Sequence, residues 1–444
     1  MERTIRKKHI TPYQISIWGF AIVITVGTLL LMLPISAKSG QVTPFSEALF
    51  TATSAVCVTG LVIHDTAMYW TTFGHFVILM LIQIGGLGVV TVAGSIAMLS
   101  GRRIGLMQRS TMQEAIAAPQ VGGIVRLTRF VLVTAFAIEF LGAAALSPVF
   151  CREFGFFKGL WYSVFHAVSA FCNAGFDLMG AGGEYSSLTA YAGHPVVNIT
   201  IMALIFTGGL GFLTWEDVRT NKLHWKRYRM QTKVIISASA VLILFPAAYF
   251  FFCEFQEEPM DRRVLLSLFQ SVTPRTAGFN TADLTEMSEA GQSIITGLML
   301  VGGSPGSTAG GMKTTTAVVL LASAISVFRR RENPCLFGRR VSTETVRNGA
   351  SILLLYLLLP VAGAVCISAV EDLPMMSCLF ETASAIGTVG LTLGITPSLG
   401  LCARIILIAL MFIGRVGGLT MIFATFSGVK PEVSKLPQGQ ITVG

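Results

Sequence analysis

The feature of this chain that most constrains its fold is a short motif with a glycine near its end, which occurs four times. The copies read SAVCVTGL at 54–61, SAFCNAGF at 169–176, SVTPRTAGF at 271–279 and SAIGTVGL at 384–391. A motif that recurs at similar intervals indicates one structural unit used repeatedly. Four copies therefore predict four-fold pseudosymmetry around a single axis.

Each motif ends an apolar segment that is too short to cross a bilayer, and a long apolar segment follows it. The composition agrees, since 53% of the 444 residues are hydrophobic, 12% are charged and the mean hydropathy is +0.69. These values exclude a soluble globular protein. The predicted fold is an all-α polytopic membrane protein in which four fused helix–pore loop–helix repeats surround a central pore.

The four repeats are expected at 1–122, 123–232, 233–346 and 347–444, with linkers at the ends of the first three and a short tail after the fourth. Long spans are expected at 13–34 and 70–99, 124–150 and 195–215, 234–253 and 293–328, and 351–370 and 401–426. The short pore segments are expected at 43–56, 157–170, 263–273 and 375–386. Eight spans place both termini on one side of the membrane.

Basic residues gather before the first span and after the second span of each repeat. They are Arg3, Arg6, Lys7, Lys8, Arg102, Arg103, Arg109, Arg219, Lys222, Lys226, Arg227, Arg229, Arg329, Arg330, Arg331, Arg339 and Arg340. The positive-inside rule then predicts cytoplasmic termini and linkers in the cell membrane. The net charge of +9 is therefore explained by basic linkers that face anionic lipid rather than by binding of nucleic acid.

The glycines of the four motifs indicate an ion path. Irregular backbone at membrane depth is stable only where protein buries it or where it lines water. Gly60, Gly175, Gly278 and Gly390 can adopt backbone angles that turn carbonyl groups inward. Carbonyl rings replace the hydration shell of a cation in the TVGYG filters of potassium channels, which residues 388–392 resemble. Glycines that only permit close helix packing are the alternative, and four equivalent copies disfavour it.

A second glycine repeat lies within the later spans, at 84–88, 207–211, 301–303 and 416–419. Only the third copy is followed by an interruption, the segment GSPGSTAGGMK at 303–313. Its helix-breaking residues are too dense for a kink and predict a mid-membrane loop. Such a loop is either a gate or a rigid packing insert.

Several charged or polar side chains are expected inside the membrane. Arg415 lies within the last span, so it should face the pore, repel cations and hold carbonyl groups, with a structural salt bridge as the alternative. Lys313 can instead extend toward the cytoplasmic surface. Arg275 is expected to brace the third motif from behind. Glu381 and Asp177 are candidate partners for these cations, and His166 is expected to be a packing residue.

The chain carries no recognisable catalytic machinery. Its eight cysteines form no C-x-x-C pair, its six histidines are scattered, and the phosphate-binding G-x-x-x-x-G-K-[ST] motif is absent. The sequence therefore predicts neither an enzyme nor a cofactor bound to this chain.

The segments SAVCVTGL, TPRTAGFNT and GTVGLTLGI resemble the Trk, Ktr and plant HKT superfamily of potassium transporters, over nearly the whole chain. The resemblance is closest to the Ktr-type membrane subunit, because the leading helix pair usual in Trk-type subunits is not seen. It implies uptake of K⁺ bound by filter carbonyls, with sodium stimulation common in Ktr systems. The implied filter residues are Val58, Thr59, Gly60, Asn173, Ala174, Gly175, Thr276, Ala277, Gly278, Thr388, Val389 and Gly390.

The resemblance also implies how transport is controlled. It identifies the interrupting segment as an intramembrane gate, made of Gly303, Ser304, Pro305, Gly306, Ser307, Thr308, Ala309, Gly310, Gly311 and Lys313 together with Arg415. It implies a homodimer on a cytosolic ring of RCK-type regulatory subunits that bind a nucleotide, ATP/ADP or NAD(H). The candidate contact segments for that ring are 102–121, 215–231 and 329–346, and the tail could join a dimer contact.

Two other transport modes stay open. In the plant branch a serine at the first filter position accompanies sodium selectivity, so Gly60 favours potassium by resemblance, and a sodium-selective member is one alternative. A stoichiometric Na⁺/K⁺ symporter is another. Alternating access predicts inverted repeats, whereas these four repeats are parallel. A receptor or scaffold would not explain four glycine loops.

Overall fold

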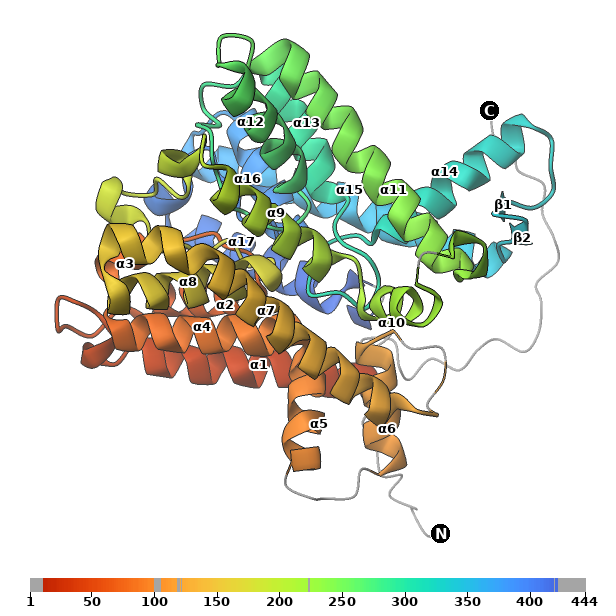
Figure 1. The fold of residues 1–444 in the computed structure, drawn as a ribbon, viewed down its shortest axis with the longest axis horizontal. Helices are drawn as coiled ribbons and strands as arrows, with labels where there is room; N and C mark the ends of the chain where they lie inside the picture. The colour runs from red at the N-terminus through yellow and green to blue at the C-terminus, as the bar shows by residue number, and fades with distance from the viewer. Residues whose placement is uncertain are drawn as a thin grey trace.

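The computed structural model describes residues 11–99, 105–117, 120, 122–222, 224–418 and 420–421. In these ranges the chain is built from helices and one short hairpin (Figure 1). The basic residues Arg3, Arg6, Lys7, Lys8, Arg102 and Arg103, and most of the expected tail, lie outside the described residues.

The first helix of each repeat is long and apolar enough to cross a membrane. These helices are α1 (Pro12–Leu31), α7 (Ile124–Phe154), α11 (Met230–Tyr249, continued as a π-helix over Phe250–Glu254) and α15 (Thr343–Glu371). Their starts follow ordinary capping chemistry: Thr11 and Gln14 form a capping box before Pro12, and Ser342 accepts from the amide of Thr345. The expected first spans are confirmed within a few residues, except that α15 begins eight residues earlier than expected.

A shorter helix follows in each repeat and ends at the glycine motif. These pore helices are α2 (Phe45–Val56), α8 (Phe156–Phe171), α12 (Met260–Val272) and α16 (Met375–Gly387). Their C-terminal halves are buried almost completely. The structure therefore contains the expected short segments at the centre of the molecule.

The second helix of each repeat is shorter than expected. These helices are α4 (Thr72–Leu87), α9 (Pro195–Gly209), α13 (Glu289–Leu300) and α17 (Leu401–Val416). At Gly88 and Gly211, with φ of 87° and 91°, α4 and α9 bend by 94° and 98° into α5 (Val89–Leu99) and α10 (Phe212–Asn221). The expected spans 70–99 and 195–215 are each interrupted by this bend, because a glycine with a positive φ ends an α-helix.

The α13–α14 loop (residues 301–313) separates α13 from α14 (Thr314–Phe328), as expected for the third repeat. Short elements complete the fold. They are α3 (Thr66–Tyr69), α6 (Leu106–Ala115), the 3₁₀ turns η1 (Pro34–Ser36), η2 (Gly180–Gly182), η3 (Thr189–Tyr191), η4 (Trp225–Arg227) and η6 (Thr396–Ser398), and the antiparallel strands β1 (Cys335–Leu336) and β2 (Arg339–Arg340).

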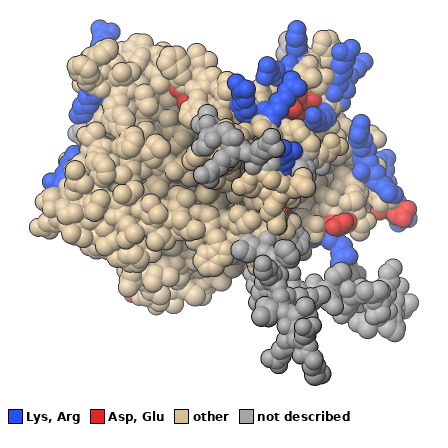
Figure 2. All heavy atoms as spheres, turned by 90° about the horizontal axis from the view of Figure 1, so that it is seen from below, with Lys and Arg blue, Asp and Glu red and all other residues tan. Residues whose placement is uncertain are grey.

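The surface has the charge distribution of a membrane protein. Figure 2 shows Lys and Arg gathered mainly at the end that carries α10, α14 and the hairpin, with a broad uncharged belt beside them. Large apolar side chains are exposed on the long helices, including Trp18 (65%), Phe140 (73%) and Phe245 (77%). Such exposure is unusual in a soluble monomer and is expected for a lipid-facing surface. With its several apolar helices, the chain is a multi-pass membrane protein.

Candidate functional site

The four motif glycines form a closed ring, which we call the glycine ring (Gly60, Gly175, Gly278 and Gly390). A Cβ atom added at each glycine would collide with the carbonyl oxygen of the residue that precedes the next glycine. The four pairs are Gly60 with Ala174, Gly175 with Ala277, Gly278 with Val389, and Gly390 with Thr59. The distance would be 2.6 Å at Gly60 and 2.8 Å at Gly175. Since the order runs through all four repeats and returns to the first, the loops surround one axis.

The backbone of each loop alternates in handedness. The residue two positions before each ring glycine also has a positive φ: 51° at Val58, 56° at Asn173, 71° at Thr276 and 51° at Thr388. Such angles are uncommon for residues other than glycine, and for β-branched ones they need support from the surrounding structure. The intervening residue in each loop does not have a positive φ, so the sign of φ alternates along the loop. This geometry suits a path lined by backbone oxygens.

Buried side-chain oxygens lie at the base of the ring without a hydrogen-bond partner among the described residues. Three belong to the residues two positions before the glycines: Asn173 Oδ1, Thr276 Oγ1 and Thr388 Oγ1. Each of these residues is fully buried. Unpaired buried polar atoms are rare in proteins, and a cation or water on the axis would satisfy them.

Each pore helix braces its own loop through a hydroxyl group near its C-terminus. Ser54 and Ser384 accept hydrogen bonds from the amides of Gly60 and Gly390, at 3.1 and 3.0 Å. In the other two repeats the hydroxyl donates to the carbonyl that follows the glycine: Ser169 to Phe176 at 2.7 Å and Thr273 to Phe279 at 2.6 Å. The motif serines thus have a role that the sequence reasoning missed. In the third copy, which is one residue longer, a threonine takes this role.

Two buried ionisable side chains fix the loop segments that leave the ring. His166 binds the carbonyl of Tyr162 through Nδ1 (2.7 Å) and accepts the amide of Leu178 through Nε2 (3.3 Å), so it is the satisfied packing residue that was expected. The equivalent side chain in the fourth repeat is Glu381, whose carboxylate accepts from Leu393 N (3.2 Å). It also accepts from the hydroxyls of Thr392 and Thr396.

The expected pairing of Glu381 or Asp177 with the intramembrane arginines is therefore wrong. Asp177 accepts the amide of Met179 at 2.9 Å. None of the four ion pairs found in the described ranges includes Arg275 or Arg415.

The second helices pack against the ring through glycines. A Cβ atom at Gly85 of α4, Gly208 of α9 or Gly414 of α17 would collide with a carbonyl at the end of the pore helix in the same repeat. The matching position in the fourth repeat is therefore Gly414, and Gly417 matches Gly88 and Gly211 with a φ of 93°. The expected equivalence of the 416–419 glycines with the earlier pairs is wrong by three residues.

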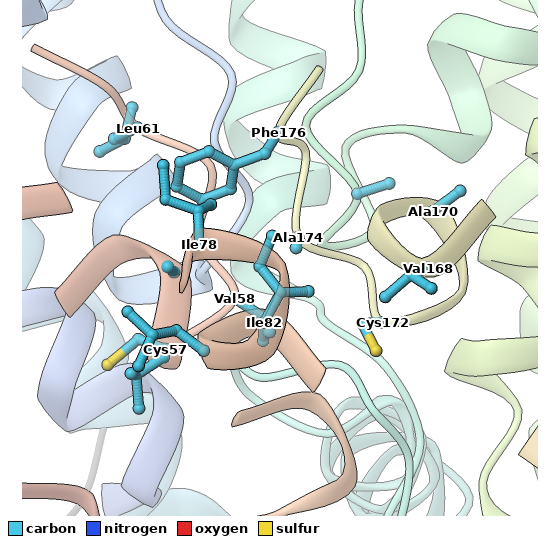
Figure 3. Close-up of a cluster of buried hydrophobic side chains, with 14 of the residues drawn as sticks. Cys57, Val58, Leu61, Ile78, Ile82, Val168, Ala170, Cys172, Ala174 and Phe176 are labelled. Atoms are coloured by element: carbon cyan, nitrogen blue, oxygen red, sulfur yellow. The ribbon is translucent and has the colours of Figure 1, made fainter. Parts of the chain in front are cut away.

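Figure 3 shows the first two loops side by side. Ile78 and Ile82 of α4 pack beside Val58 and Ala174, and the sulfur of Cys172 lies at the base of the second loop. All of these side chains are buried. An apolar layer thus encloses the loops and holds their backbone in place.

The α13–α14 loop lies directly against the base of the glycine ring. Thr308 donates to the carbonyl of Phe171 at 2.9 Å and accepts from the Asn173 amide group at 3.1 Å. A Cβ atom at Gly310 would collide with Thr388 of the fourth repeat. Ser304 and Thr308 are completely buried. The loop is therefore enclosed by protein rather than exposed to lipid.

Arg415 joins this loop to the first repeat. Its guanidinium donates to the carbonyl of Thr308 and to those of Gly85 and Gly86, the last at 3.0 Å. Arg415 occupies the position at which the first two repeats have Gly86 and Gly209. The structure places it against carbonyl groups, as expected, and gives no support to the salt-bridge alternative. A planar guanidinium suits this arrangement because it can donate to several acceptors at once.

One further cation contacts the loop, and another contacts the residue that follows it. The ammonium of Lys313 donates to the carbonyls of Ala309 (2.9 Å) and Gly310 (3.4 Å), so it does not extend away from the loop. Arg275 donates to the Thr314 hydroxyl at 3.3 Å and is 8% exposed, consistent with a brace behind the third motif.

Hollows lie on both sides of this region. A hollow of about 910 Å³ lies where the loops leave the ring, and it is lined by Asn280, Thr281 and Thr392. Its acidic lining residues are Glu184, Glu254, Glu257, Glu258, Asp283 and Glu286, against the single base Arg262. A second hollow of about 390 Å³ lies beyond the α13–α14 loop, and its charged lining residues are Lys313 and Arg415 against the single acid Glu114. The ring and the loop thus lie between an acidic and a basic chamber.

Comparison with known proteins supports this architecture. The sequence model of a family described as "TrkH: Cation transport protein" matches residues 2–432. The potassium/sodium uptake protein NtpJ of Enterococcus hirae is 40% identical, over all of this chain and 99% of that protein. The Ktr system potassium uptake protein B of Bacillus subtilis is 37% identical, over all of this chain and 99% of its own length.

The structural comparison agrees with the sequence comparisons. The crystal structure of the potassium transporter TrkH from Vibrio parahaemolyticus matches with a TM-score of 0.73 and 17% identity, over 95% of this chain and 86% of that one. At 17% sequence identity, this structural match shows that the two chains share a fold. The resemblance seen in the motifs is confirmed.

Proposed function

Because the chain belongs to the TrkH family of cation transport proteins, we propose that it takes up potassium through the glycine ring. The observation that carries this proposal is the closure of the four loops, in which each ring glycine lies against a carbonyl of the next repeat. The chain is a membrane transporter and not an enzyme, since its relatives are ion transport proteins.

The chemistry of the ring suits a partly dehydrated monovalent cation. Carbonyl oxygens replace the water that the ion loses, and the unpaired oxygens of Asn173, Thr276 and Thr388 add ligands at the base. The acidic hollow raises the local concentration of cations at the entrance. Uptake then follows the membrane potential from the acidic to the basic chamber, with the termini and linkers in the cytoplasm.

The α13–α14 loop is the proposed gate. It lies across the base of the ring, and Arg415 holds it by the carbonyl of Thr308. The positive charges of Arg415 and Lys313 also oppose the passage of a cation. Displacing the loop would open the path, so deleting residues 304–310 is expected to raise the flux.

Control by a partner is the remaining part of the proposal. By the resemblance to Ktr-type membrane subunits, the chain is proposed to form a homodimer regulated by a cytosolic nucleotide-binding ring, with ATP/ADP or NAD(H) bound to that ring, and with sodium stimulation. The name of the Enterococcus relative includes sodium, which favours sodium coupling or sodium transport as a second candidate. A K⁺ gradient built up under membrane potential alone would argue for a pore, and a strict need for a Na⁺ gradient would argue for symport.

Selectivity in liposomes tests the ring. Uptake of K⁺ and Na⁺ would be compared for the native chain and for Gly278→Ser, with Gly297→Ser as control, because Gly297 is an exposed α13 residue with open space at its Cβ position. We expect Gly278→Ser to lose K⁺ preference and Gly297→Ser to retain it. A folded Gly278→Ser protein with native selectivity would place the ion path elsewhere.

A further inference from the structure

A third hollow of about 620 Å³ lies away from the ion path, between the beginning of α7 and the helix α10. Its described lining includes three arginines, Arg126, Arg219 and Arg229, and one acidic residue, Glu216. Arg229 pairs with Glu216 at 3.2 Å. Neither Arg126 nor Arg219 forms an ion pair with a carboxylate of the described chain. The hollow therefore has an excess of positive charge.

The arginines are held in place by different elements. The guanidinium of Arg219 stacks over the ring of Phe130, 5.0 Å from its centroid, which favours one orientation of a long side chain. The backbone amide of Arg229 donates to the Asp217 carboxylate at 2.8 Å and fixes this residue beside α10. The guanidinium of Arg219 and the backbone of Arg229 are thus positioned without any ligand.

The start of α7 adds a further electropositive group. This helix of 31 residues begins after Gly123, which has a φ of 79° and provides no side-chain cap. The first amides of a helix have no partner within the helix, and the helix dipole favours an anion beside them. Gly122, Gly123 and Ile124 all line the hollow. Arginine forks together with a free helix start form a binding site suited to phosphate.

The face of α7 that leads away from the hollow indicates the source of the phosphate. Positions 126, 130, 133, 137 and 140 follow one another along one side of the helix. Beyond Phe130 this side is apolar and exposed, with Val133 64% and Phe140 73% accessible. An acyl chain could therefore extend along α7 from a headgroup held by Arg126. A free phosphate ion has no acyl chain and gains nothing from this apolar face.

We propose that this hollow binds the headgroup phosphate of an anionic phospholipid, whose acyl chains lie along the exposed face of α7. The lipid belongs to the leaflet at the end of the molecule where Figure 2 shows Lys and Arg gathered. Basic pockets between membrane helices are suited to such headgroups. The site is distinct from the glycine ring and from the α13–α14 loop, so its occupation bears on anchoring at the membrane rather than on ion selection.

Lipid binding to the delipidated full-length protein in a neutral detergent tests this assignment. Phosphatidylglycerol, phosphatidylcholine and inorganic phosphate would be added separately, and retained lipid and the rise in Tm would be measured. We expect phosphatidylglycerol to bind and to raise Tm more than phosphatidylcholine, and inorganic phosphate to have little effect. Loss of charged hydrogen bonds should weaken phosphatidylglycerol binding by about tenfold for each arginine in Arg126→Gln and Arg126→Gln/Arg219→Gln.

The matched control is Arg330→Gln/Arg331→Gln, which removes two exposed charges after α14. It should bind phosphatidylglycerol like the native chain. Equal loss in both double variants would show nonspecific attraction and overturn the proposal. A rise in Tm with inorganic phosphate equal to that with phosphatidylglycerol would overturn the assignment of the site to a lipid. The single variant Arg126→Gln keeps the contact of Arg219 with Phe130, so it tests the site even if the double variant is unstable.

Discussion

Replacing Arg415 by alanine should raise ion flux, because it removes a side chain whose hydrogen bonds join the α13–α14 loop to the first repeat. Among its three carbonyl acceptors, only that of Thr308 belongs to the loop. A hydrogen bond from a charged group contributes about 1.5–3 kcal/mol. Losing it shifts the equilibrium of the loop toward the displaced state by about 10- to 150-fold at 1.4 kcal/mol per factor of ten. The flux should rise by a similar factor while the loop is mostly closed.

The assay is Rb⁺ or K⁺ uptake into liposomes at a fixed membrane potential, with the folding of each variant checked by size-exclusion chromatography. Arg415→Lys keeps the charge but cannot bridge the same carbonyls, so its flux should lie between those of the native chain and Arg415→Ala. Arg404→Ala is the control, because Arg404 lies at the other end of α17 and donates to Leu399. Native flux in both folded Arg415 variants would refute the reasoning.

Three other predictions follow from contacts around the ring. Glu381→Ala removes the acceptor of the Leu393 amide and of the Thr392 and Thr396 hydroxyls, of which only Thr396 is fully buried. Leaving a buried donor unpaired costs about 1–3 kcal/mol, so this variant should lower Tm and selectivity, whereas Glu381→Gln should be milder. Equal Tm values for the two variants would contradict this. Thr308→Val removes two hydrogen bonds of the loop and should raise flux in the liposome assay, and a decrease would argue against a gate. Burial, with the nearby charge of Asp65, raises the pKa of Asp177 to about 7, so K⁺ affinity should improve as external pH rises through 7, when the carboxylate becomes charged. Asp177→Asn should abolish that dependence, and an unchanged pH profile would exclude Asp177 as its source.

The central features of the site could be predicted because each has a local signature. Four similar motifs revealed the repeats, and dense glycine, serine and proline residues revealed the α13–α14 loop. A lone arginine in an apolar helix identified Arg415, since such a charge requires partners. These features depend on neighbouring residues along the chain and on the cost of polar groups in lipid, so no knowledge of distant contacts was needed.

Other features depend on contacts that the sequence does not contain. Gly414 and Gly417 lie three residues apart in one apolar segment, and only packing against the carbonyls of α16 shows which one matches Gly85. The bends after α4 and α9 were missed because hydropathy continues through Gly88 and Gly211. The hydrogen-bonding role of Glu381 depends on residues that follow the ring, ten or more positions away.

Cations are proposed to pass through the glycine ring, and anomalous diffraction would locate them there most directly. Crystals of the protein grown with Rb⁺ or Tl⁺ in place of K⁺ would be measured at the absorption edge of that ion. Peaks are expected on the axis between the carbonyl oxygens of Thr59, Ala174, Ala277 and Val389, and near the side-chain oxygens of Thr276 and Thr388 at the base of the ring. Peaks only elsewhere in a protein that transports the same ion would contradict it.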